Sequence, residues 1–190
     1  MALFDLYGSS KTFIPQLTRS TSDPRPVVVM TCGIAGSGKS TLAKYIVSTY
    51  NLYHRLSIDS WVYNHYGLYG TDYPAERYSG YQEEAESALR IELASLLREG
   101  AQDVVLDFSF AFRETRDEWK QLVEAYGGRW VLLYLDVEAD ELRRRVRARN
   151  SLKAKDGDSA FPVTEEILEG YLRGFERPDQ EGEVVLRIKG

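Results

Sequence analysis

The stretch that most constrains the fold is GIAGSGKS, residues 33–40, which lies between the apolar run VVVMT and a helical pattern. It fits the pattern G-x-x-x-x-G-K-[ST], in which a strand leads into a glycine-rich loop and the loop leads into a helix. Glycines let successive backbone N–H groups point inward at phosphate oxygens, where a Cβ atom would obstruct them. The sequence therefore predicts a phosphate-binding loop at a strand-to-helix junction.

Each fixed position of this loop has a chemical role. Lys39 supplies a positive charge for the β- and γ-phosphates, and Ser40 offers a hydroxyl to Mg²⁺. The helix that begins here turns its positive end toward the anion. We therefore expect a nucleotide with Mg²⁺, held by Gly33, Ala35, Gly36, Ser37, Gly38, Lys39, Ser40 and Thr41.

Short β-branched runs alternate with helical patterns along the chain. The expected strands are residues 27–31, 54–58, 104–108, 131–135 and 184–188. The expected helices are residues 42–50, a long segment ending near residue 99, 114–126, 139–150, and a last segment from about residue 164 to Pro178. Strands separated by helices predict an α/β fold whose parallel sheet is covered by helices on both faces.

The length of 190 residues fits one domain. We expect residues 27–190 to form this domain. Residues 1–26 are interrupted by three prolines and are expected to be a loosely structured N-terminal extension. Residues 151–162, SLKAKDGDSAFP, look like a mobile loop.

The composition argues against several classes of protein. With 24 basic and 29 acidic residues, a surface built throughout to hold a polyanion is not expected, although a local basic groove stays open. A single cysteine, Cys32, excludes an intramolecular disulfide and a cysteine zinc site; we expect core filling, with a redox sensor as the alternative. His54 and His65 have no metal-binding spacing. Without a secretory pattern or an apolar run of about 18 residues, we expect a cytoplasmic protein with no membrane association.

Two carboxylates follow predicted strands. Asp107 ends the run DVVLD, and Asp59 ends the run HRLSID. Because the carboxyl ends of parallel strands meet at one edge of a sheet, Asp59 can approach the γ-phosphate from the acceptor side and act as a base. Asp107 can hold Mg²⁺ or its water shell. For both residues the alternative is a helix N-cap, a position that aspartate favours.

The segment ELRRRVRARN, residues 141–150, predicts a helix that directs two arginines at phosphate. Arg145 and Arg149 lie four residues apart on one face, while Leu142 and Val146 lie on another. Positive charge over the transferring phosphate is a main source of rate in phosphoryl transfer. The alternative is a solvated face stabilised by ion pairs among residues 140–145.

Several segments together resemble one family. They are GxxxxGKST, the SID after the second strand, VVLDFSF, YLDVEADELRRRVRARN and FERPDQEGE. They resemble the small P-loop kinases, in the branch that contains chloramphenicol phosphotransferase, zeta-type toxin kinases, gluconate kinase and polynucleotide 5'-kinase. A GTPase would need a downstream N-K-x-D segment, which is lacking, and an AAA-type motor would need a second helical domain for which little chain is left.

The resemblance covers most of the chain after residue 26. It implies a three-layer, nucleoside-kinase-like P-loop fold with a five-stranded parallel sheet in order 2-3-1-4-5 and a mobile lid that carries arginine. It also implies ATP as the nucleotide, with Lys39 and Ser40 in the phosphate and magnesium roles. By the same resemblance Asp59 is the catalytic base, and Arg145 or Arg149 is the lid arginine.

Residues 61–81, WVYNHYGLYGTDYPAERYSGY, are dense in aromatic side chains. In this fold the segment after the second strand covers the acceptor, so these rings suit a ring-bearing substrate. We expect contacts from Trp61 and Tyr73, with Arg77 holding an anionic acceptor and Arg113 reaching the acceptor or the phosphates. The alternative is core packing beside a turn-rich surface, because three glycines of this segment, at positions 67, 70 and 80, are expected to break any helix.

These observations predict an ATP-dependent phosphotransferase that acts on a hydroxyl of a small molecule such as a nucleoside, a sugar or an antibiotic. A polynucleotide 5'-hydroxyl or nucleotide-sugar kinase is the alternative among enzymes. Polynucleotide kinases often place an arginine three residues beyond the catalytic aspartate, where this chain has Val62, which weakens a nucleic-acid acceptor without excluding it. An alternative of another class is a nucleotide-binding regulatory protein with little transfer activity. The sequence predicts neither the acceptor nor the oligomeric state.

Overall fold

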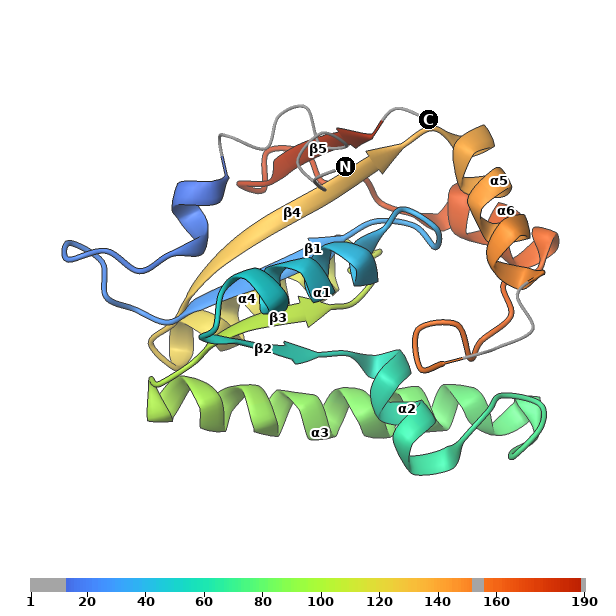
Figure 1. Cartoon of the computed structure of the whole chain (residues 1–190), viewed down its shortest axis with the longest axis horizontal. Coiled ribbons are helices and arrows are strands. Elements are labelled where there is room, and N and C mark those ends of the chain that lie inside the picture. Colours follow the sequence, from blue (N-terminus) through green and yellow to red (C-terminus); the bar gives the residue numbers. More distant parts are fainter. Residues whose placement is uncertain (1–12, 152–155, 189–190) are drawn as a thin grey trace.

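A computed structural model of the chain describes residues 13–151 and 156–188. Its centre is a five-stranded sheet in the order β2-β3-β1-β4-β5, and each neighbouring pair is parallel (Figure 1). The strands are β1 (Val27–Cys32), β2 (Tyr53–Leu56), β3 (Asp103–Asp107), β4 (Arg129–Val137) and β5 (Val184–Ile188). The predicted fold class and strand order are therefore confirmed.

Helices cover both faces of this sheet. The α-helices are α1 (Lys39–Thr49), α2 (Ile58–Tyr66), α3 (Tyr78–Glu99), α4 (Arg113–Ala125), α5 (Ala139–Asn150) and α6 (Glu165–Gly174). Two short 3₁₀ helices are η3 (Ile14–Leu17) and η4 (Ala75–Arg77). Among the described residues, no helix is both long and apolar enough to cross a membrane.

Alternation along β1 explains the three layers. Val27 and Val29 belong to a core cluster with residues of α1 and α5, whereas Val28 and Met30 belong to a second cluster with residues of α3 and α4. Successive side chains of a strand point to opposite faces, and every residue of β1 is buried, so this strand is covered on both sides. The run VVVMT is therefore a central strand, as its sequence predicts.

The register of the sheet places the functional segments together. Thr31 of β1 lies opposite Asp107 of β3 and Leu133 of β4. The carboxyl ends of these strands point toward the side of the molecule where α2, α5 and α6 lie (Figure 1). Ligands of open parallel sheets bind at this edge.

The prediction of a loosely structured N-terminal extension is wrong for residues 13–19. Phe13 and Leu17 are buried in the core cluster on the α1 face. The hydroxyl of Tyr53 donates a hydrogen bond to the carbonyl of Leu17 at 2.7 Å, and Arg19 pairs with buried Asp103 at 2.8 Å. The first part of this segment therefore packs on the α1 face of the sheet. The domain boundary at residue 26 stays a prediction.

The segment after β2 is more helical than predicted. β2 ends at Leu56 rather than residue 58, and Ser57 caps α2 by accepting a hydrogen bond from the backbone N–H of Ser60. Gly67 ends this helix, but Gly80 lies inside α3, so the expectation that it breaks any helix is wrong. Of the predicted mobile loop, residues 152–155 lie outside the described part of the chain.

Candidate active site

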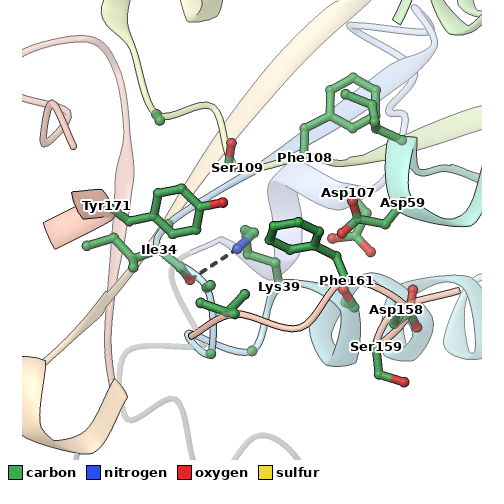
Figure 2. A pocket seen from close by; sticks show the side chains of 18 of the residues that line it. Ile34, Lys39, Asp59, Asp107, Phe108, Ser109, Asp158, Ser159, Phe161 and Tyr171 are labelled. Carbon is green, nitrogen blue, oxygen red and sulfur yellow. Dashed lines mark hydrogen bonds between the residues drawn. The ribbon is translucent and has the colours of Figure 1, made fainter. Parts of the chain in front are cut away.

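A pocket of about 880 Å³ opens at the carboxyl ends of the strands. Its walls come from the phosphate loop, α1, the start of α2 and α3, the segment after β3, α5, the segment at residues 156–163, and α6. Figure 2 shows this pocket from close by. Among the residues predicted for the nucleotide, all but buried Ser37 line it: Gly33, Ala35, Gly36, Gly38, Lys39, Ser40 and Thr41.

The glycines of the phosphate loop meet steric and conformational demands. Gly36 and Gly38 have φ angles of 84° and 101°, which side chains rarely adopt. A Cβ atom at Gly36 would lie 3.0 Å from Cγ2 of Val146, and one at Gly33 would lie 2.7 Å from Oγ of Ser37. The loop is therefore tightly curled and packed against α5, which fixes its backbone N–H groups.

Lys39 lies at the first position of α1 and reaches back over the loop. Its Nζ donates a hydrogen bond to the carbonyl of Ile34 at 3.1 Å, as the dashed line of Figure 2 shows. Burial lowers the pKa of Lys39, and the carboxylates of Asp107 and Asp59 oppose that shift. This enclosed ammonium group is placed to receive phosphate oxygens.

Asp59 lies in the first turn of α2, not at the end of a strand. Its carboxylate faces the pocket, where it accepts a hydrogen bond from the hydroxyl of Tyr78 at 3.2 Å. Enclosure by the pocket walls raises the pKa of Asp59, the charge of Asp107 raises it further, and Lys39 opposes the shift. Because Ser57 is the N-cap, the alternative role of Asp59 as the capping residue is wrong.

Asp107, the last residue of β3, is buried and lines the same pocket. Its oxygen Oδ2 accepts hydrogen bonds from Nε of Arg55 at 3.0 Å and from Nη2 of Arg55 at 2.5 Å. The N-cap of the following helix is Phe112, so a capping role for Asp107 is wrong as well. Arg55 was not predicted as a site residue, because no local pattern reveals a partner 52 residues away.

Asp158, which was not predicted either, extends the network of Arg55 and Asp107. Asp158 forms ion pairs with Arg55 and Lys44 and accepts a hydrogen bond from Oγ of Ser60 at 3.3 Å. The preceding Gly157 lies so close to α2 that a Cβ atom there would be 3.1 Å from Cα of Ser60. The described part of the predicted mobile loop is therefore fastened beside the pocket.

The two predicted lid arginines both line the pocket from α5. Nη1 of Arg145 lies 3.5 Å from the carbonyl oxygen of Ser37, and its Nε donates to Glu141 at 2.6 Å. The charge of Arg149 opposes the rise that burial causes in the pKa of Asp59 and adds to the fall that burial causes in the pKa of Lys39, so this arginine lies near both residues. The ion pair between Glu141 and Arg145, which was expected if this helix were only a solvated face, is therefore present. The same helix also brings the guanidinium groups of Arg145 and Arg149 to the pocket.

The family follows from a comparison with known protein families. Residues 28–178 match a family described as an AAA domain. The chain belongs to this family. A comparison with curated proteins gives no match.

Solved structures show that this AAA domain has the fold of the P-loop kinases. A candidate kinase from Chloroflexus aurantiacus J-10-fl matches with a TM-score of 0.67 and 19% identity, covering 86% of this chain and 84% of that chain. A gluconokinase from Sinorhizobium meliloti 1021 matches with a TM-score of 0.56 and 19% identity, covering 88% and 84%. The Mycobacterium tuberculosis APS kinase CysC, in complex with AMPPNP and APS, matches with a TM-score of 0.59 and 19% identity, covering 86% and 89%.

Four residues predicted to contact the acceptor lie outside the pocket lining. Trp61 stacks on His65 with ring centroids 3.8 Å apart, and Tyr73 is buried against neighbouring tyrosines. Arg77 is exposed at the start of α3, and exposed Arg113 lies 3.7 Å from Asp117. The pocket instead contains Tyr78, from the same aromatic segment, together with residues to which the sequence assigned no role. Among these are Gln82, Ser109, Phe161 and Tyr171.

The residues at this edge of the sheet fit a magnesium–nucleotide complex. Ser40, Asp59 and Asp107 all line the pocket, and Mg²⁺ binds through one or two carboxylates together with substrate phosphates. Within residues 13–151 and 156–188, no cluster of three or more His, Cys, Asp or Glu side chains forms a metal cage.

Proposed function

We propose that this AAA domain transfers the γ-phosphate of MgATP to a hydroxyl of a small molecule. One observation carries the proposal. The carboxylate of Asp59 shares a pocket with Lys39 and the phosphate loop, at a carboxyl edge where the fold binds its ligands. A phosphate loop alone would serve binding or hydrolysis, whereas a carboxylate facing the same space supplies the base that an acceptor hydroxyl requires.

The proposed reaction assigns one role to each group. Asp59 accepts the proton of the acceptor hydroxyl while the hydroxyl oxygen forms a bond to the γ-phosphorus. The bond from that phosphorus to the β,γ-bridging oxygen breaks, and ADP leaves with the bonding electrons. The raised pKa of Asp59 makes it a stronger proton acceptor than an ordinary aspartate.

The remaining cations neutralise the transferring phosphate. Lys39 meets the β- and γ-phosphates, and Arg145 and Arg149 cover the equatorial oxygens from α5. Mg²⁺, held by Ser40 and a carboxylate, would neutralise charge that develops on the phosphates. The pair between Arg55 and Asp107 keeps that carboxylate directed at this site.

A small-molecule acceptor is favoured over a nucleic acid. Val62, at the position where polynucleotide kinases often have an arginine, is buried in an apolar cluster with Tyr73 and Ala85. This position therefore offers no charge to a nucleic-acid backbone. Two similar structures, a gluconokinase and an APS kinase, add support for small acceptors on this fold. A cytoplasmic location, where MgATP is available, is part of the proposal.

The test is transfer of labelled γ-phosphate from MgATP to a panel of nucleosides, sugars, sugar acids, hydroxylated antibiotics and 5'-hydroxyl oligonucleotides. Wild-type protein should label one small-molecule class, and Lys39→Ala should abolish labelling. Labelling of oligonucleotides alone would favour the polynucleotide alternative. MgATP binding without labelling of any acceptor would favour the regulatory protein and contradict the proposal.

A further inference from the structure

One part of the pocket differs in chemistry from the phosphate loop. We call it the acceptor wall: Tyr78, Gln82, Ser109, Phe112 and Tyr171, all of which line the pocket. The hydroxyl of Tyr78 donates a hydrogen bond to Asp59 at 3.2 Å. Burial raises the pKa of Tyr171, and the nearby charge of Asp59 raises it further. The wall therefore adjoins the proposed base, where an acceptor hydroxyl has to lie.

Large aromatic surfaces are exposed on this wall. Phe112 is 53% exposed and Tyr171 is 44% exposed, whereas most large apolar side chains are buried. Tyr78 stacks on Phe161 with ring centroids 4.6 Å apart and an angle of 6° between the planes. In Figure 2 the rings of Tyr171 and Phe161 project into the pocket. Such surfaces suit a flat or apolar ring, because moving its apolar surface out of water lowers the free energy of the complex.

The polar groups of the wall are neutral. They are the amide of Gln82, the hydroxyl of Ser109 and the two phenols of Tyr78 and Tyr171, which donate and accept hydrogen bonds without a net charge. Asp59 adds a negative charge beside them. An anionic acceptor placed here would therefore meet repulsion and find no paired cation on the wall.

No cation belongs to the wall itself among the described residues, and most cations of the pocket lie beside the phosphate loop. Among the described residues that line it, the lysines and arginines are Lys39, Lys44, Arg145 and Arg149. Lys39 and Arg145 lie against carbonyl oxygens of the phosphate loop, and Lys44 pairs with Asp158. Arg149 of α5 approaches the wall, because its charge opposes the rise in the pKa of Asp59 and of Tyr171, and the proposed function assigns this arginine to the transferring phosphate. The positive charge is thus collected around the phosphates of the nucleotide and the γ-phosphate that is transferred.

We infer that the acceptor is an uncharged alcohol carrying an aromatic or other apolar ring, rather than a sugar acid or a nucleotide. The inference rests on the proposed function, because it identifies the wall as the acceptor site from its proximity to Asp59. It narrows the substrate class to neutral ring compounds, among them unmodified nucleosides and hydroxylated aromatic antibiotics.

The experiment uses matched acceptor pairs that differ in charge: a nucleoside and its 5'-monophosphate, which keeps the 3'-hydroxyl, and a hydroxylated aromatic amide and its carboxylate analogue. The wild-type protein should transfer labelled phosphate to the neutral member of at least one pair, with kcat/KM about tenfold or more above the anionic member. Preference for the anionic member would overturn this inference and leave the kinase proposal standing. Transfer to no acceptor, with MgATP still bound, would overturn both.

A positive charge introduced on the acceptor wall tests whether the acceptor lies there, through the ratio of kcat/KM for the neutral and anionic acceptors. Gln82→Arg should reduce the neutral-to-anionic ratio about tenfold, since the new guanidinium pairs with an anionic acceptor. Ser87→Arg adds the same charge at an exposed site of α3 outside the pocket and should leave the ratio unchanged. Equal ratios in wild type and Gln82→Arg, with Ser87→Arg also unchanged, would place the acceptor away from this wall and overturn the inference.

Discussion

Arg55 holds Asp107 by two hydrogen bonds to one carboxylate oxygen, with Nε at 3.0 Å and Nη2 at 2.5 Å. The pair joins β2 to β3 near the carboxyl ends of both strands, and Asp158 pairs with the same Nη2 atom of Arg55. Burial lowers the pKa of Arg55, but the charges of Asp107 and Asp158 and their hydrogen bonds raise it overall. This arginine therefore positions a candidate magnesium ligand and fastens the segment at residues 156–163.

The first prediction concerns the stability that this pair provides. Arg55→Met should lower the free energy of unfolding by about 3 kcal/mol, because it leaves the buried carboxylate of Asp107 without its partner. Urea unfolding followed by circular dichroism measures the change. The control is Arg25→Met, since Arg25 forms an exposed pair with Asp23 and should show no measurable loss. Equal losses in the two variants would contradict the role given to Arg55.

The second prediction is a pH dependence at Asp158. Burial alone would raise the pKa of Asp158, but hydrogen bonds from Lys44 and Arg55 lower it below its ordinary value. Its contribution to stability is therefore complete above the unfolded pKa of about 4 and is lost as the pH falls through the lower folded pKa. Asp158→Asn should lower the free energy of unfolding at pH 7, and its difference from wild type should shrink below about pH 4.

Asp156→Asn is the matched control for this prediction. Asp156 lies two residues away and approaches the same Lys44 only at 3.8 Å, with its side chain 66% exposed. Its substitution should change stability little at any pH. A difference between Asp158→Asn and wild type that grows as the pH falls would contradict the assigned direction of the pKa shift.

The third prediction is that Asp59 affects stability and activity in opposite directions. Its folded pKa is raised, so the charged carboxylate destabilises the folded state above that pKa, and this penalty disappears as the pH falls through it. Asp59→Asn should therefore melt at a higher temperature than wild type at pH 8, with a smaller difference at pH 5. The transfer rate of wild type should fall over the same pH interval, because the base becomes protonated. A lower melting temperature for Asp59→Asn at pH 8 would contradict this account.

The fourth prediction separates the arginines of α5. Arg149→Ala and Arg145→Ala should each lower kcat about a hundredfold, with a smaller effect on the affinity for MgATP, because their charges act mainly on the transferring phosphate. Arg144→Ala removes a neighbouring arginine that pairs with Glu141 and lies outside the pocket. It should leave kcat unchanged. Steady-state kinetics on the three variants measure kcat. A decrease of kcat in Arg144→Ala as large as in Arg145→Ala and Arg149→Ala would indicate destabilisation of the helix instead and contradict the prediction.

Local patterns explain what the sequence predicted well. The phosphate loop depends on eight consecutive positions, 33–40, and the apolar run before it identifies a strand covered on both faces. The five strands and their order follow from such runs and from the family resemblance, and the structure confirms them. The four-residue spacing of Arg145 and Arg149 predicted that one face of α5 carries both arginines, and both line the pocket.

Contacts between distant segments explain the rest. Asp158 meets Arg55 across 103 residues of sequence, and the composition around it, KDGDS, suggests only a polar loop. The packing of Phe13 and Leu17 was not predicted, because the prolines of this segment indicated loose structure and its contacts are with distant parts of the chain. Among the aromatic residues of the segment 61–81, sequence alone does not separate those that build the α2–α3 core from Tyr78, which faces the pocket.

The most direct test of the central claim compares MgATP affinity with phosphate transfer in Asp59→Asn. The kinase account predicts that the variant binds MgATP with the wild-type dissociation constant, by isothermal titration calorimetry, while transfer to the accepted substrate falls about 10²–10⁴-fold. Asp140→Asn, which changes a 98% exposed carboxylate, should match wild type in both measurements. Unchanged transfer in Asp59→Asn would contradict the claim that this carboxylate is the base of a phosphotransferase.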